Sequence, residues 1–480
     1  MLMLLLSLIA LALRVWGLNS DLWVDEVFTL LDFVRVPLGE IVTSYPSQNQ
    51  HMLLSLLSHI SISVFGESAW ALRIPSVMFG VASLWALFLL GRSMAGKREA
   101  LLASALMTVS YHHVWFRKTH AVIWASFSLL CWRLGFGSEA SRKDSWGWWL
   151  GYVAAVSLGM WIHMTMAFVV AAHVLIYLGA LIFPFRNSAG VNQRSVKASA
   201  LEEHVKAPGI YRLLVSRAKL KPVIAWLLCV SVTLQLYALA LPEFIQTGFH
   251  EVSLESEWTS PLWVIAEAVR NLRLGEGGLI GLAVMMGAGI VLTGAGWVSL
   301  LRRDCQSALA VVLPALLAGA AMLALGHNLW PRFFFFSMGF GLLIIVHGVV
   351  VCAHSLFAHF SARPASEESW GQIAGLALVC LLIAASAATL RKNYMLPKQN
   401  FSGARDYVEH HRRPDEGVVA VGLAGIMYGR YFAPQWSVAQ TQSELDAVWR
   451  RHSSTWPRLY AANRSKSVPP RNMEHDQRGF

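Results

Sequence analysis

Eleven long apolar stretches, separated by short polar connections, constrain this chain more than any other feature of its sequence. A helix needs about 20 mostly apolar residues to cross the roughly 30 Å hydrocarbon layer of a bilayer. The stretches lie at 2–18, 70–91, 99–116, 120–136, 146–162, 165–184, 223–241, 277–300, 307–326, 333–352 and 370–389. The sequence therefore predicts an all-α polytopic membrane protein with about 11 transmembrane helices, and 11–13 are compatible with the pattern.

The composition supports the same class and excludes several others. Hydrophobic residues make up 55% of the 480 residues and charged residues only 14%, whereas an average soluble domain has about 25% charged residues. A soluble enzyme, a disordered chain and a secreted disulfide scaffold are therefore excluded. The net charge of +11 is explained by basic loops on the cytoplasmic side of a membrane, so we expect membrane lipids and no nucleic acid as partners.

The segment 52–65 decides the topology. Its 14 residues are apolar but short and contain four serines, so it is either a twelfth crossing or a helix in the membrane interface. If it does not cross, the basic segments all fall on one side; they are 92–98, 142–143, 186–221 and 302–303. The acidic loop 242–276 then falls on the other side. The positive-inside rule favours this model, with the N-terminus inside and the C-terminus outside.

The polar tail after residue 390 differs in kind from the rest of the chain. Residues 417–423 are typical of a short buried strand, and 404–411 of a short helix. We therefore expect a small α/β domain at 391–462 on the outer face and a disordered tail at 463–480. The transmembrane domain would occupy 1–390, with an outer loop at 19–51 and the interfacial helix at 52–65.

Two adjacent carboxylates, Asp25 and Glu26, follow the first apolar stretch. One interpretation is that they begin a helix, where Asp25 caps free backbone amides and Glu26 suits the first turn. The other is that they form a general base at the membrane surface. By themselves the two residues do not decide between these interpretations.

Three further blocks follow at defined distances along the chain. They are Asn49–His51 before the short helix, Phe65–Pro75 after it, and Ser110–Phe116 at a helix end. With Trp23–Glu26, these blocks resemble the large family of membrane glycosyltransferases that take a sugar from a polyprenyl phosphate, which have the GT-C fold. Its branches include protein O-mannosyltransferases and lipid A aminoarabinose transferases. The resemblance is strongest along residues 14–185.

The resemblance implies an inverting transfer at the outer face of the membrane. Asp25 would be the general base that takes the proton of an acceptor hydroxyl or amine, and Glu26 would orient Asp25 or the acceptor. Cations would stabilise the departing phosphate, with Arg332 as first candidate and Arg117 or Lys118 as second. The donor would be a polyprenyl-phosphate sugar, and the location the bacterial inner membrane.

One block departs from the family pattern. Related sequences often continue after the Trp-Phe pair with Ser-Gln-Asn-Ala-Arg-Gly-Tyr, but here Ala121 and Ile123 stand where Arg and Tyr are expected. This departure keeps open a catalytically silent relative that binds a polyprenyl lipid. A transporter or flippase is a third hypothesis, although transporters usually place ionisable residues at mid-membrane and contain repeated halves.

Several histidines near the outer face are candidates for the substrate site, or else ordinary polar residues at helix ends. They are His51, His112, His113, His120 and His163. Glu26, His51 and His250 carry groups that could bind a divalent metal ion. No close ligand spacing indicates such a site, and the lipid-linked sugar is predicted as a substrate.

Overall fold

The computed structural model describes most of the chain. The described residues are 1–47, 49–115, 120–137, 146–182, 217–248, 278–325, 329, 331–360, 368–395, 399–414, 416–452 and 459–462. The chain divides into two compact units. The helical unit comprises Met1–Leu18 and Val36–Met395, and the α/β unit comprises Asn19–Arg35 and Leu396–Phe480. The predicted disordered tail 463–480 lies outside the described residues.

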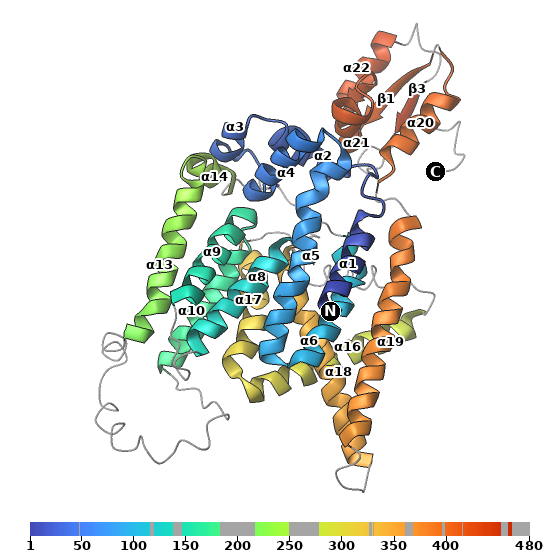
Figure 1. Cartoon of the computed structure of the whole chain (residues 1–480). Helices are drawn as coiled ribbons and strands as arrows, with labels where there is room; N and C mark the ends of the chain where they lie inside the picture. The colour runs from blue at the N-terminus through green and yellow to red at the C-terminus, as the bar shows by residue number, and fades with distance from the viewer. Residues whose placement is uncertain are drawn as a thin grey trace, which may run out of the picture. The chain divides into compact units, whose positions relative to one another are not determined.

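Each apolar stretch of the sequence has a helix as its counterpart in the helical unit (Figure 1). The helices are α1 (Leu2–Val15), α5 (Ala69–Met94), α6 (Lys97–Thr108), α8 (His120–Gly137), α9 (Trp146–Ile162), α10 (Met166–Ile182), α13 (Arg217–Tyr237), α16 (Gly278–Arg303), α17 (Cys305–Ala324), α18 (Met338–Phe360) and α19 (Glu368–Met395). Among the described residues, five helices are by themselves long and apolar enough to cross a membrane. They are Ala69–Met94, Leu220–Tyr237, Cys305–Ala324, Phe333–His359 and Trp370–Met395.

Two predicted stretches are not single regular helices. The stretch 99–116 divides into α6 and the short α7 (Tyr111–Trp115), because Val109 leaves the helical conformation. The β-branched pair Thr108 and Val109 has low helix propensity, and its position matches the break. The stretch 333–352 begins as a 3-10 turn, η4 (Pro331–Ser337), before α18 starts.

Helix α5 packs against α1, α4 (Met52–Phe65), α6 and α8. Its side chains Leu84, Leu87 and Leu90 are fully buried in the main core. On another side of the bundle, α16 packs against α18, and α18 against α19. The interior is thus made by helix-on-helix packing, as expected for a chain in which every backbone amide in lipid must bond within its own segment.

The segment 52–65 forms helix α4 (Met52–Phe65), with the bounds expected from the sequence. Two of its four serines bond to the backbone of α5 near Pro75, which lies inside that helix. Proline has no N–H, so the carbonyl of Ala71 lacks its usual helical donor. Ser61 Oγ donates to that carbonyl at 2.7 Å, and Ser58 Oγ donates to the next one, on Leu72, at 3.0 Å.

Two short helices in the connections hold the segment that leads into α4. Helix α3 (Leu38–Thr43) precedes it, and α14 (Leu241–Gly248) contacts it from a distant part of the chain. The Tyr45 N–H donates to Glu243 at 2.6 Å, and Thr247 Oγ1 donates to the Tyr45 carbonyl at 2.9 Å. Burial of its ring raises the pKa of Tyr45 to about 12.

The α/β unit contains a three-stranded parallel sheet in the order β2-β1-β3. Strand β1 (Gly417–Val421) is central and fully buried, as the sequence 417–423 indicates, with β2 (Ser437–Ala439) and β3 (Leu459–Ala462) beside it. Parallel strands need crossover connections. These are supplied by α21 (Gly422–Met427) with the π-helical turn η5 (Tyr428–Phe432), and by α22 (Gln442–His452). Helix α20 (Phe401–His411) precedes the sheet.

Candidate active site

The two carboxylates of the first loop lie on a short helix, α2 (Val24–Phe28), of the α/β unit. The helix begins at Val24, with Trp23 in the extended conformation before it. Asp25 therefore occupies the second helical position and not the cap position. It is Glu26 that closes the helix start, because its carboxylate accepts the backbone N–H of Trp23 at 3.3 Å. Both carboxylates are half-buried.

Helix α2 ends at Phe28 and continues directly into a π-helical turn, η1 (Thr29–Val34). Thr29 Oγ1 donates to the Asp25 carbonyl at 2.7 Å. Val27, Leu30 and Phe33 are buried at 2% exposure or less. These apolar anchors fix one side of the segment, while the two carboxylates remain half-buried. π-Helical turns are rare in proteins overall, and many of those that occur lie at functional sites.

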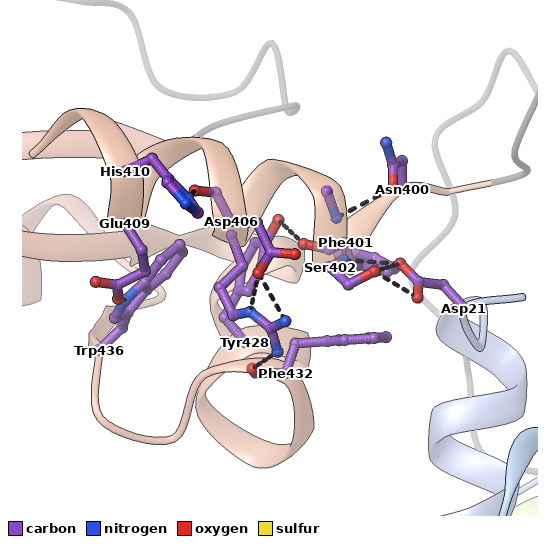
Figure 2. Close-up of polar contacts among 12 residues, drawn as sticks. Asp21, Asn400, Phe401, Ser402, Asp406, Glu409, His410, Tyr428, Phe432 and Trp436 are labelled. Atoms are coloured by element: carbon purple, nitrogen blue, oxygen red, sulfur yellow. Dashed lines mark hydrogen bonds and ion pairs between the residues drawn. The ribbon is translucent and has the colours of Figure 1, made fainter.

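Residues from the other end of the chain also contact this segment within the α/β unit. Figure 2 shows the Asp21 carboxylate accepting the backbone N–H and the hydroxyl of Ser402, at 2.7 and 2.6 Å. Gln399 Oε1 accepts the N–H of Val24 at 2.9 Å. Arg430 forms an ion pair with Asp32. None of these long-range contacts is predicted by the sequence pattern.

In the helical unit, the structure brings two predicted candidates together. His51 and His163 stack, with ring centroids 5.2 Å apart and an interplanar angle of 21°. His51 Nδ1 donates to the Ile162 carbonyl at 2.8 Å, so Nε2 is the basic nitrogen of the neutral ring. His163 Nδ1 accepts the N–H of Thr165 at 3.3 Å, so its Nε2 carries the proton. These bonds and the stacking therefore hold the two rings in defined orientations.

A third candidate, His113, is buried and holds three helices together. Arg14 of α1 donates to His113 Nδ1, and His113 Nε2 donates to Ser83 Oγ of α5 at 3.1 Å. Ser83 Oγ in turn donates to the Gly80 carbonyl at 2.8 Å. Arg14 is only 6% exposed, and it is not among the site residues predicted from the sequence. An arginine inside an apolar stretch was the available signal, because ionisable residues there usually carry a function.

His112 lies beside the turn that contains Arg332. The centroid of its ring is 5.4 Å from that of Tyr111 and 6.5 Å from that of Phe335 of η4. The structure describes the backbone of Arg332 within η4 and that of His120 at the start of α8. Arg117, Lys118 and His250 lie outside the described residues. Within the described part of the chain, no three His, Cys, Asp or Glu side chains are grouped as metal ligands.

Part of the chain matches a known protein family. Residues 50–188 match the model of the family described as dolichyl-phosphate-mannose-protein mannosyltransferase. This segment includes His51, His112, His113 and His163, and it ends short of the α/β unit's C-terminal residues. It covers less than a third of the chain. No curated protein sequence matches the chain.

Solved structures resemble nearly the whole chain. ArnT from Cupriavidus metallidurans bound to undecaprenyl phosphate matches with a TM-score of 0.53 and 11% identity, over 95% of this chain and 89% of that one. Its apo state matches with a TM-score of 0.50 and 14% identity, over 94% and 88%. The Archaeoglobus fulgidus oligosaccharyltransferase in the apo form has a TM-score of 0.47 and 14% identity, over 91% and 64%.

The chain is thus a multi-pass membrane protein with the GT-C fold of polyprenyl-phosphate-dependent membrane glycosyltransferases. This result confirms the predicted fold class, including a small α/β part near the C-terminus. It also confirms the resemblance stated from the sequence blocks.

Proposed function

We propose that this protein moves a sugar from a polyprenyl-phosphate donor to an acceptor hydroxyl or amine, with inversion at the anomeric carbon. The match of residues 50–188 to a family of lipid-linked sugar transferases supports the donor class. The observation that carries the site is the half-buried Asp25 on a short helix whose flanks are anchored. The proposed location is the outer face of a bacterial inner membrane.

In the proposed reaction, Asp25 removes the acceptor proton while the acceptor oxygen or nitrogen attacks the anomeric carbon. The bond from that carbon to the phosphate oxygen breaks, and polyprenyl phosphate leaves with an additional negative charge. Arg332 is the first candidate to stabilise that charge, and Arg117 or Lys118 is the second. The role of Glu26 is to hold the start of α2, because its carboxylate accepts the Trp23 N–H.

The histidine candidates divide into two groups in this proposal. His51 and His163 bind substrate, as the resemblance implies, and their stacked rings fix each other's orientation. His112 and His120 are further candidates for the substrate site, as the resemblance implies. His113 keeps α1, α5 and α7 in register through Arg14 and Ser83. No step of the mechanism passes through a metal ion bound at Glu26, His51 or His250.

The test uses the purified protein in detergent with a panel of polyprenyl-phosphate sugars. Release of polyprenyl phosphate is measured for the unchanged protein, Asp25→Asn and the control Asp446→Asn, whose side chain is exposed on α22. Loss of a general base typically costs about 10²- to 10⁴-fold in rate. We expect a loss of that order for Asp25→Asn and none for the control.

The other outcomes favour the alternative functions. If no donor turns over but polyprenyl phosphate still binds, the protein is a catalytically silent lipid-binding relative. The altered residues Ala121 and Ile123 are then the first explanation. If the lipid does not bind at all, the transferase proposal is wrong and a transporter or flippase becomes the leading hypothesis.

A further inference from the structure

The segment that carries Asp25 is joined to the C-terminal part of the α/β unit on both sides of that residue. Before it, Asp21 accepts two hydrogen bonds from Ser402 at the start of α20 (Figure 2). After it, Asp32 forms an ion pair with Arg430 of η5, with a second N–O separation of 3.3 Å. The Arg430 guanidinium also lies over the Phe28 ring, 6.0 Å from its centroid.

Gln399 acts on the helix itself. The first amides of any helix have no acceptor within the helix. Gln399 Oε1 supplies one for Val24, the first residue of α2, at 2.9 Å from a position 375 residues later in the chain. Asp25 is the next residue, so the orientation of its backbone depends on this distant cap.

A helix as short as α2 needs such support. Its five residues fall far below the roughly 12–15 that an isolated helix requires for marginal stability in water. The anchored positions surround the carboxylates on both sides: Asp21, Val24, Phe28, Asp32 and Arg35, the last lying 5.8 Å from the Tyr431 ring. Local sequence alone therefore does not determine where Asp25 lies.

We propose that Gln399, Ser402 and Arg430 are positioning residues that set the geometry of Asp25, so that the C-terminal part of the chain is a component of the active site. This inference rests on the proposed role of Asp25 as general base. None of the three residues handles a proton or the substrate. They act through the backbone of 21–35, and a displacement of about 1 Å at a reacting group can cost about 100-fold in rate.

The experiment compares four variants in the polyprenyl-phosphate release assay: Gln399→Ala, Ser402→Ala, Arg430→Ala and the control Arg412→Ala. Arg412 pairs with Glu409 and also binds the Glu416 carbonyl, both within the C-terminal part, and its side chain is 31% exposed against 43% for Arg430. We expect kcat to fall about 10- to 100-fold for Arg430→Ala and Gln399→Ala, with the KM for the donor nearly unchanged. Arg412→Ala should keep the unchanged rate.

A charge exchange separates positioning from general stability. Asp32→Arg combined with Arg430→Asp restores the ion pair in reverse, and we expect it to recover most of the rate lost in either single variant. If the exchange fails to recover activity, or if Arg412→Ala loses as much as Arg430→Ala, the inference is wrong. Gln399→Ala removes no charge and gives an independent reading if Arg430→Ala does not fold.

The failure of this inference differs from the failure of the proposed function. If Asp25→Asn is inactive while Gln399→Ala, Ser402→Ala and Arg430→Ala all turn over at the unchanged rate, only the positioning role is refuted. If Asp25→Asn itself keeps full activity, the proposed function fails first.

Discussion

A close approach of two helix backbones in the described part of the bundle predicts a large effect from a single methyl group. Gly348 of α18 and Gly296 of α16 lie where these helices cross. A Cβ at position 348 would lie 1.9 Å from the Leu292 carbonyl oxygen, whereas ordinary contacts begin at 3.4 Å. The helices would therefore have to separate by about 1.5 Å, since a backbone oxygen cannot rotate away as a side chain can.

We expect Gly348→Ala to destabilise the folded protein. Overpacking of this kind costs about 1–3 kcal/mol, and the rigidity of the contact favours the upper value. The better helix propensity of alanine offsets about 1 kcal/mol, which leaves about 2 kcal/mol. Gly294→Ala is the matched control in α16, because a Cβ there has nothing within 4 Å. It should be neutral or slightly stabilising.

The assay is the folded fraction remaining after heating in detergent, for the unchanged protein and both variants. Gly296→Ala should resemble Gly348→Ala, because its Cβ would lie 2.2 Å from the Ile344 carbonyl oxygen. The double variant should cost less than the sum of the two, since both act at one contact. If Gly348→Ala proves as stable as Gly294→Ala, the close packing of α16 on α18 is wrong.

Two further predictions concern hydrogen-bonded carboxylates. His347 Nδ1 bonds to Glu99 at 2.5 Å, and its Nε2 bonds to Ser299 at 3.0 Å. His347→Ala should lower the free energy of unfolding by about 1–3 kcal/mol, because both partners lose this hydrogen bond. An unchanged melting temperature would contradict this prediction. Burial raises the pKa of Glu409, but hydrogen bonds from Trp436 and Arg412 outweigh it and lower that pKa below 4.5. A lowered folded-state pKa stabilises the protein above pH 4.5 and less as the pH falls below it. Trp436→Phe should therefore destabilise the protein by about 1 kcal/mol at pH 7. The difference in melting temperature between the variant and the unchanged protein should shrink below pH 4.5. A difference that does not change with pH would show that Trp436 acts only by packing.

The helices of the bundle were predictable because they are local structures. In lipid each backbone amide must bond within its own segment, so length and apolarity indicate a helix without knowledge of its neighbours. The helix 52–65 was predicted with the observed bounds. The break after Thr108 was not predicted, because it interrupts an apolar stretch without a charge or a proline at the break itself. The turn η4 was not predicted either, because the run of four phenylalanines after Pro331 and Arg332 is as apolar as the helix that follows it.

Of the C-terminal part, only the central strand and the helix before it were predictable. Strand β1 is buried on both faces and reads as a continuous apolar run. β2 has three residues and β3 has four, which is too short for a period to be recognised. Their partners are distant in sequence, and only the parallel pairing with β1 makes them strands.

The candidate site shows the same division. The sequence by itself determined that Asp25 and Glu26 follow the first apolar helix, and that His51 and His163 lie at the ends of other apolar helices. Only the tertiary structure decided that His51 stacks on His163, and that Gln399, Ser402 and Arg430 anchor the carboxylate segment. The reason is physical: a helix in lipid is specified by its own residues, whereas a contact across 375 positions exists only once the chain has folded and brought the two segments together.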